Sequence, residues 1–174
     1  VSARYQAART PESDGICVSM PPTACTDAER MSGGLPANIR GIVASKLLGF
    51  YREGSLVLGD FDAKASDIDL RAALADDIDD QEFDALQHMH AKLVKDHPEW
   101  DDRIEVCYIS VPALMQVKSR TSEIVNISPG EPFHRTQAKQ EWVMNWYLSR
   151  EKSKTIFGPD PKTIIEPISK DEFI

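Results

Sequence analysis

The chain has 174 residues, 41% of them hydrophobic, and a formal net charge of −8. This size fits one globular domain with appendages, and no apolar run reaches the ~20 residues that a membrane-spanning helix requires. The acidic balance argues against a large duplex nucleic-acid interface, which needs a basic surface. It is compatible with a small cationic substrate, because acidic clefts attract cations, although acidity that serves only solubility would look the same.

The cysteine content and the first residues bear on the compartment. Cys17, Cys25 and Cys107 form no even, closely spaced framework of the kind found in disulfide-rich secreted domains. The first residues also lack the apolar segment of a secretory leader. Both observations favour a reducing, cytoplasmic location.

Residues 1–34 are predicted to be a flexible N-terminal tail. They combine prolines and glycines with few large apolar residues, which leaves little surface to bury in a core. We expect order to begin near Leu35, because Ile39, Ile42 and Leu47 then follow at helical spacing.

Hydrophobic periodicity and turn residues predict the elements that follow. The acidic loop is expected to cap the helix after it, since carboxylates favour a helix N-terminus. In chain order we expect a strand over 48–51, a Gly-Ser turn, a strand over 67–74, the acidic loop 76–80, a helix ending before Pro98 and a strand over 104–109.

The last third of the chain has a weaker pattern. Trp142 and Trp146 lie four residues apart in an amphipathic segment, and we expect them to pack in the core rather than to stack on a base. The predicted elements here are a short helix over 113–117, a small strand over 124–127, a turn over 129–132 and a helix over 140–150.

The most informative motif is a Gly54-Ser55 turn followed by the pair Asp67 and Asp69. Alternate side chains of a strand share a face, so the two carboxylates lie together while Ile68 points into the core. Neighbouring carboxylates repel each other unless a cation lies between them, and Mg²⁺ suits carboxylate and phosphate oxygens. Glycine lets the backbone approach a ligand, and a serine at a helix start leaves N–H groups free for phosphate.

Glu105 is the third acid of this predicted site. It lies in the middle of the 104–109 strand, flanked by Ile104 and Val106. A carboxylate in a half-buried strand is costly unless it is paired or bound to metal, so Glu105 is a candidate metal ligand or general base. A solvent-facing glutamate on an edge strand is the alternative.

This pattern, Gly-Ser followed by Asp-x-Asp, resembles the signature of the polymerase-beta-like nucleotidyltransferases. Later segments, including Glu105–Ile109 and Phe157–Pro161, are similar to the aminoglycoside nucleotidyltransferases of the streptomycin/spectinomycin adenylyltransferase type. The resemblance implies an α+β fold, a mixed sheet flanked by helices. It also implies a nucleotidyltransferase domain over 35–120 and a C-terminal extension over 121–174 that begins a truncated helical domain.

The same resemblance implies a mechanism and a role in antibiotic resistance. Asp67 and Asp69, with Glu105 as a further ligand, would hold Mg²⁺ against the triphosphate of ATP, and Gly54 and Ser55 would bind phosphate. Glu105 would take a proton from a hydroxyl of an aminoglycoside-like, cationic, polyhydroxylated substrate. AMP is then transferred to that hydroxyl and pyrophosphate leaves.

Two residues depart from the family's pattern. Arg71 stands where an apolar residue is usual, and alternation places it on the face of the acid pair, where it could neutralise a carboxylate, contact a phosphate or mark lost activity. Glu53 precedes Gly54, where an aromatic residue or histidine is commoner. Two other functions therefore stay open: an antitoxin-like enzyme that adenylylates a protein, and a truncated, non-catalytic nucleotide-binding domain in which Arg71 pairs with Asp69.

Overall fold

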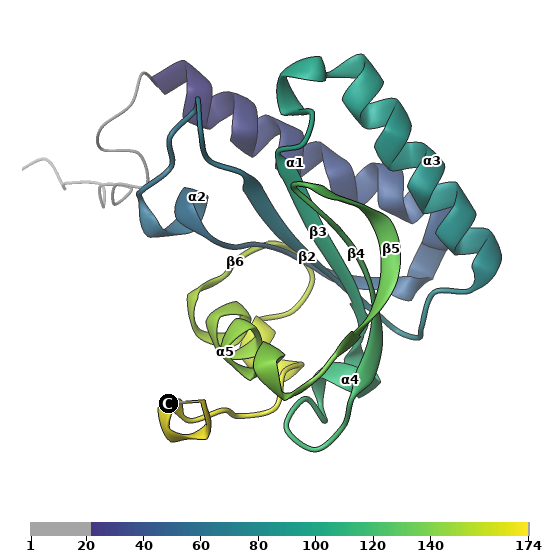
Figure 1. Ribbon diagram of the computed structural model, residues 1–174, viewed down its shortest axis with the longest axis vertical. Helices are drawn as coiled ribbons and strands as arrows, with labels where there is room; N and C mark the ends of the chain where they lie inside the picture. Colours follow the sequence, from purple (N-terminus) through teal and green to yellow (C-terminus); the bar gives the residue numbers. More distant parts are fainter. Residues whose placement is uncertain (1–21, 174) are drawn as a thin grey trace, which may run out of the picture.

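A single mixed sheet organises the computed structural model, which describes residues 22–173 (Figure 1). Residues 1–21 of the predicted tail, with Cys17, lie outside the described residues. No helix within 22–173 is both long enough and apolar enough to cross a membrane. The helices are α1 (Pro22–Val43), α2 (Ser55–Leu58), α3 (Asp80–Asp96), α4 (Val111–Leu114) and α5 (Val143–Lys152). The strands are β1 (Leu47–Arg52), β2 (Ile68–Leu74), β3 (Ile104–Ser110), β4 (Ser122–Ser128), β5 (Glu131–Ala138) and β6 (Lys154–Phe157).

The strand order is β5-β4-β3-β2-β1-β6. Only β2 and β3 run parallel, and the other four neighbouring pairs are antiparallel. A parallel pair needs a crossover connection, which α3 provides. The predicted α+β fold, a mixed sheet flanked by helices, is confirmed.

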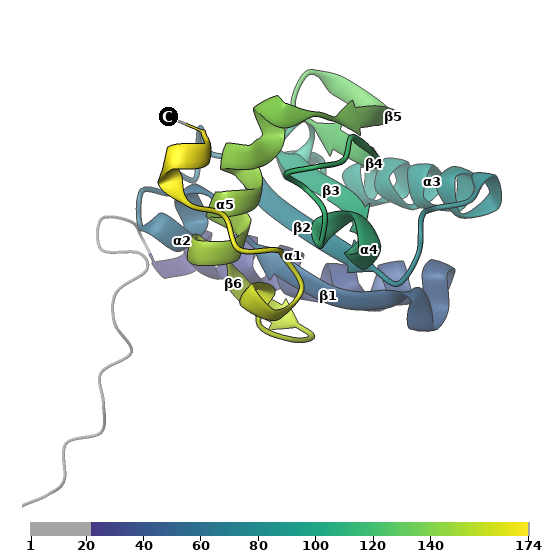
Figure 2. The ribbon, with the colours of Figure 1, turned by 90° about the horizontal axis from the view of Figure 1, so that it is seen from below.

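The two faces of the sheet carry different side chains because residues alternate along each strand. Leu70 and Ala72 of β2 pack into a core with α1 and α3, whereas Ala73 packs into a second core with Trp146 of α5. Figures 1 and 2 show α1 and α3 on one side of the sheet and α5 on the other. Asp69 and Arg71, alternating with Leu70 and Ala72, therefore lie on the α5 face.

Helix α3 begins where the acidic loop ends, as predicted. The Asp79 carboxylate accepts from the backbone N–H of Glu82 at 2.8 Å, and the Glu82 carboxylate accepts from the N–H of Asp79 at 3.0 Å. This capping box satisfies N–H groups that have no partner within the helix. The helix ends before Pro98, also as predicted.

The expectation that order begins near Leu35 is wrong, because α1 starts at Pro22. Proline is tolerated in the first turn of a helix, and the glycines and Pro36 inside α1 concealed its periodicity. Ala28, Leu35 and Ile39 are buried along one side of the helix. Arg52 of β1, itself buried, holds the early part of α1 by donating to Ser32 Oγ at 2.6 Å.

Two strands, β5 and β6, were not predicted. The turn expected over 129–132 is shorter, and β5 begins at Glu131. Both strands lie at sheet edges and bury few side chains, so their apolar alternation is weak. The sheet also crosses the boundary predicted at residue 120, since β4 pairs with β3 and β6 pairs with β1.

The segment after β6 is held against β1 by close backbone contact. Gly158 has φ +91°, and a Cβ at this position would lie 2.2 Å from the carbonyl oxygen of Leu48. The Tyr51 hydroxyl donates to the carbonyl of Pro159 at 2.9 Å, and burial followed by the nearby Asp160 charge raises the pKa of Tyr51 to about 12. The Gly158–Pro159 turn thus fastens the C-terminal part of the chain to the sheet.

We expect Gly158→Ala to destabilise the protein by about 2 kcal/mol or more, since it adds a backbone clash to the strain of a positive φ. Gly130→Ala is the matched control, because Gly130 has φ +77° but open space around it, and should cost only about 1–2 kcal/mol. Urea unfolding of the two variants measures the difference. Equal losses would contradict the close packing of Gly158 on Leu48.

Candidate active site

The parallel pairing of β2 and β3 brings two of the predicted acids together. Asp69 and Glu105 are register partners on these strands, which places their Cα atoms on neighbouring strands about 4.8 Å apart in the hydrogen-bonding direction. Asp67 lies one residue before β2 begins, and all three acids are half-buried. Asp69 and Glu105 therefore lie side by side on the α5 face, and the charge of Asp67 acts on both of them.

These carboxyl groups have perturbed acidities. Burial raises the pKa of Asp69 from its ordinary value of 3.8 to about 6, and the charges of Glu105, Asp67 and Glu53 add to the rise. Burial also raises the pKa of Glu105, while Arg71 acts in the opposite direction. Like charges held close together in a half-buried site make a cation favourable there.

The Gly54-Ser55 turn packs directly on this acid cluster. Gly54 has φ +63°, and a Cβ added to it would lie 1.9 Å from Oδ2 of Asp69. The backbone N–H of Glu53 donates to the carbonyl of Asp69 at 2.9 Å. Ser55 opens the single turn of α2, and the buried Leu56 anchors that turn. Only glycine allows this approach, so the turn and the Asp69 carboxylate form one unit.

Arg71 pairs with Glu53, the other unusual residue of the motif. Its Nε donates to Oε1 of Glu53 at 3.0 Å and its Nη2 donates to Oε2 at 2.7 Å. The guanidinium lies 4.6 Å from the ring centroid of Trp146, and its Nη1 has no hydrogen-bond partner. An ion pair between Arg71 and Asp69, considered from the sequence, is not the contact that forms.

Arg71 also influences Cys107, its register partner on β3. Burial raises the pKa of the Cys107 thiol to about 11, although Arg71 lowers it. A buried, protonated thiol is a poor nucleophile, so Cys107 belongs to the core beneath the site. Trp146 is 1% exposed, and its ring stacks on that of Trp142 with the two ring centroids 5.5 Å apart. The predicted core position of Trp146 is confirmed.

The sequence marks Arg71 and Glu53 as unusual residues but does not indicate that they pair. Opposite charge and a shared strand face were the available signals. Nothing in the spacing of the two residues predicts a bidentate pair, because β1 and β2 must first align side by side. The contact of Trp146 with Arg71 was missed for the same reason, since α5 folds onto the sheet from a distant part of the chain.

The donor chemistry of the acids fits Mg²⁺. Within residues 22–173, no group of three or more His, Cys, Asp or Glu side chains is arranged as a ready metal cage. Mg²⁺ does not need one, because it commonly binds one or two carboxylates together with substrate phosphates and water. Asp69, crowded by like charge, and Asp67 beside it are suitable ligands. A direct ligand role for Glu105 stays a prediction.

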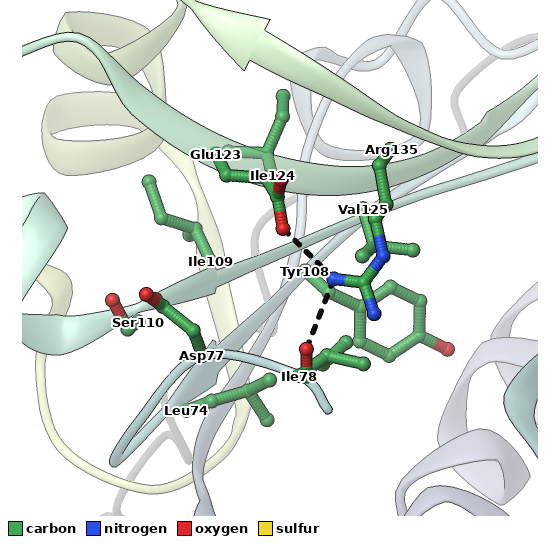
Figure 3. Close-up of a pocket in the computed structure, with 10 residues that line it drawn as sticks. All are labelled: Leu74, Asp77, Ile78, Tyr108, Ile109, Ser110, Glu123, Ile124, Val125 and Arg135. Atoms are coloured by element: carbon green, nitrogen blue, oxygen red, sulfur yellow. Dashed lines mark hydrogen bonds and ion pairs between the residues drawn. The ribbon is translucent and has the colours of Figure 1, made fainter. Parts of the chain in front are cut away.

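A small cavity at the far end of β2 and β3 is separate from the acids. It is lined by Leu74 and Ser110, the last residues of those strands, and by Arg135, which donates to Glu123 and to the carbonyl of Ile78 (Figure 3). Its volume is about 10 Å³, roughly what one water molecule needs. The cavity is too small for a substrate.

Comparison with known proteins identifies the fold. No protein-family model matches the chain, and no curated protein matches its sequence. The structure is similar to the crystal structure of spectinomycin adenyltransferase AAD(9) from Enterococcus faecialis with ATP and spectinomycin, at a TM-score of 0.67 and 16% identity. The chain therefore shares the fold of that enzyme. The match covers 84% of this chain and 62% of that protein, so the chain spans about three-fifths of its length.

Asp69 generates a prediction for the metal-free protein. Its pKa is higher in the folded state than in the unfolded state, so the folded state binds more protons between pH 4 and 6. The free energy of unfolding should therefore fall as the pH rises through this range. Asp69→Asn removes this pH-dependent fall in the free energy of unfolding and should stabilise the protein by about 1–2 kcal/mol at pH 7. This is less than the full pKa shift of Asp69 implies, because the side chain is partly solvated.

Urea unfolding in EDTA at several pH values measures this effect. Asp84→Asn, at an exposed acid of α3, is the matched control and should follow the wild type. Mg²⁺ should raise the melting temperature of the wild type but not that of Asp69→Asn. Parallel pH profiles for wild type and Asp69→Asn would contradict the crowded carboxylate.

Proposed function

We propose that this protein is a magnesium-dependent nucleotidyltransferase that transfers AMP from ATP to a hydroxyl of an aminoglycoside-like small molecule. The observation that carries the proposal is the placement of Asp69 beside Glu105, with Gly54 packed on the Asp69 carboxylate. The adenylyltransferase fold supports the same reaction, since the similar structure holds ATP and spectinomycin.

Each residue has a role in this proposal. Asp67 and Asp69 would hold Mg²⁺, and the bound ion would neutralise phosphate charge. Gly54 and Ser55 would receive phosphate oxygens through the backbone at the start of α2, because the first N–H groups of a helix have no partner within it and no side chain caps this turn. Such residues accelerate the reaction by positioning the nucleotide and balancing its charge.

Glu105 would act as the general base. In this reaction the acceptor hydroxyl loses its proton to the carboxylate, its oxygen bonds to the α-phosphorus, and pyrophosphate leaves. The raised pKa of Glu105 suits this role, because a base works best when its pKa approaches the working pH. Its position beside Asp69 would place the base next to the bound nucleotide.

The acceptor is expected to be a polyhydroxylated cation. The acids at the site and the net charge of −8 both attract cationic molecules. A protein acceptor, as in an antitoxin-like enzyme, is the second candidate. The non-catalytic alternative loses one of its supports, since Arg71 pairs with Glu53.

Pyrophosphate release from Mg-ATP, measured against an aminoglycoside panel with streptomycin and spectinomycin, tests the proposal. Glu105→Gln should lower kcat by about 10²–10⁴-fold because it removes the base, and it should leave Mg-ATP affinity nearly unchanged unless Glu105 also binds the metal. Asp69→Asn should weaken Mg-ATP binding as well. Asp84→Asn serves as the control with wild-type activity.

The outcomes separate the candidates. Release that depends on one acceptor and is lost in Glu105→Gln would establish the transferase. ATP binding without release would favour the protein acceptor. Absence of magnesium-dependent ATP binding in the folded wild type would refute the nucleotidyltransferase proposal.

A further inference from the structure

We infer that Arg71, Glu53 and Trp146 form a clamp that positions the Gly54-Ser55 turn and controls the charge beside the nucleotide. The inference deepens the proposed function and rests on it. All three are positioning residues, because they act on the turn and on the acid cluster through their contacts with one another.

The clamp is continuous from α5 to the acid cluster. The Trp146 ring lies 4.6 Å from the guanidinium of Arg71, and Arg71 holds both carboxylate oxygens of Glu53. Glu53 is bonded covalently to Gly54, and Gly54 lies against the carboxylate of Asp69. A displacement of Arg71 would therefore move the turn that packs on a predicted metal ligand.

The pair is well buried. The side chains of Arg71 and Glu53 are only 6% and 14% exposed. A bidentate arginine–carboxylate pair fixes both partners in orientation, which a lysine could not do. A buried charge without a partner destabilises the folded protein, so Arg71 and Glu53 each depend on the other. The two unusual residues of the motif are therefore partners of each other.

The pair also keeps two charged groups, the Glu53 carboxylate and the Arg71 guanidinium, from interfering with ligand binding. Glu53 freed from Arg71 would be a further carboxylate beside the phosphates, and like charges repel. Arg71 freed from Glu53 shares the strand face of Asp69, two residues along β2, and would compete with Mg²⁺ for that carboxylate. The bond between them neutralises both effects.

Because the two freed charges act on different ligands, the two single variants should differ in which ligand they bind more weakly. At saturating Mg²⁺, Arg71→Gln should weaken ATP binding about tenfold or more, because it frees the Glu53 carboxylate toward phosphate. Glu53→Gln should instead weaken the binding of Mg²⁺ alone, about tenfold or more, because it frees the guanidinium toward Asp69. A loss of structure alone would weaken both ligands in both variants.

The double variant Glu53→Gln/Arg71→Gln removes both free charges. It should recover both affinities to within about fivefold of the wild type and remain weaker, since the turn has lost its anchor. Arg135→Gln is the matched control, because Arg135 is also an ion-paired arginine over an aromatic ring, 4.9 Å from Phe83, but lies on the opposite face. It should lower stability and leave both affinities unchanged.

Calorimetric titration with Mg²⁺ and with ATP measures both affinities, and circular dichroism confirms folding. If a single variant fails to fold, the test uses Arg71→Lys, which keeps the charge and loses the bidentate contact, and its ATP affinity should lie between wild type and the double variant. Additive losses in the double variant, or equal losses of both ligands in both single variants, would overturn the inference while leaving the proposed function intact. A wild type that binds neither ligand would overturn both.

Discussion

The site depends on the parallel hydrogen bonding of β2 to β3. This pairing sets Asp69 opposite Glu105, while Leu70 and Val106, one position along, face the core. A shift of one residue would exchange the two faces and bury the acids, because side chains alternate along a strand. The crossover through α3 makes the parallel pair possible, so the capped helix on one face supports the acids on the other.

Burial and neighbouring like charge act together on the acids of this site. The same strands that carry the acids also carry the core, so the carboxylates lose part of their hydration and their pKa values rise. One bidentate ion pair, between Arg71 and Glu53, offsets part of the negative charge. What remains is an excess of carboxylates in a half-buried position, an arrangement that favours a divalent cation.

The last third of the chain belongs to the same body as the motif. Edge strand β6 extends the sheet beside β1, and the Gly158 turn locks against the backbone of Leu48. Helix α5 covers the face below the acids and places Trp146 on Arg71. The segment after residue 120 therefore contributes both to the stability of the sheet and to the geometry of the site.

The sequence by itself determined the local features. Alternation put Asp69 and Arg71 on one face, glycine allowed the turn at Gly54, and the spacing of Asp79 and Glu82 specified a capped helix start. These features depend on residues that are close in the chain, so they can be predicted without knowing the fold.

Only the tertiary structure decided the contacts between distant segments. The pairing of Asp69 with Glu105, the bond from Arg71 to Glu53 and the edge strands β5 and β6 each require another segment to be in place. The early half of α1 shows the same dependence, since it is held by the buried Arg52. Periodicity carries no information about such partners, because it records which face a residue takes and not what that face will meet.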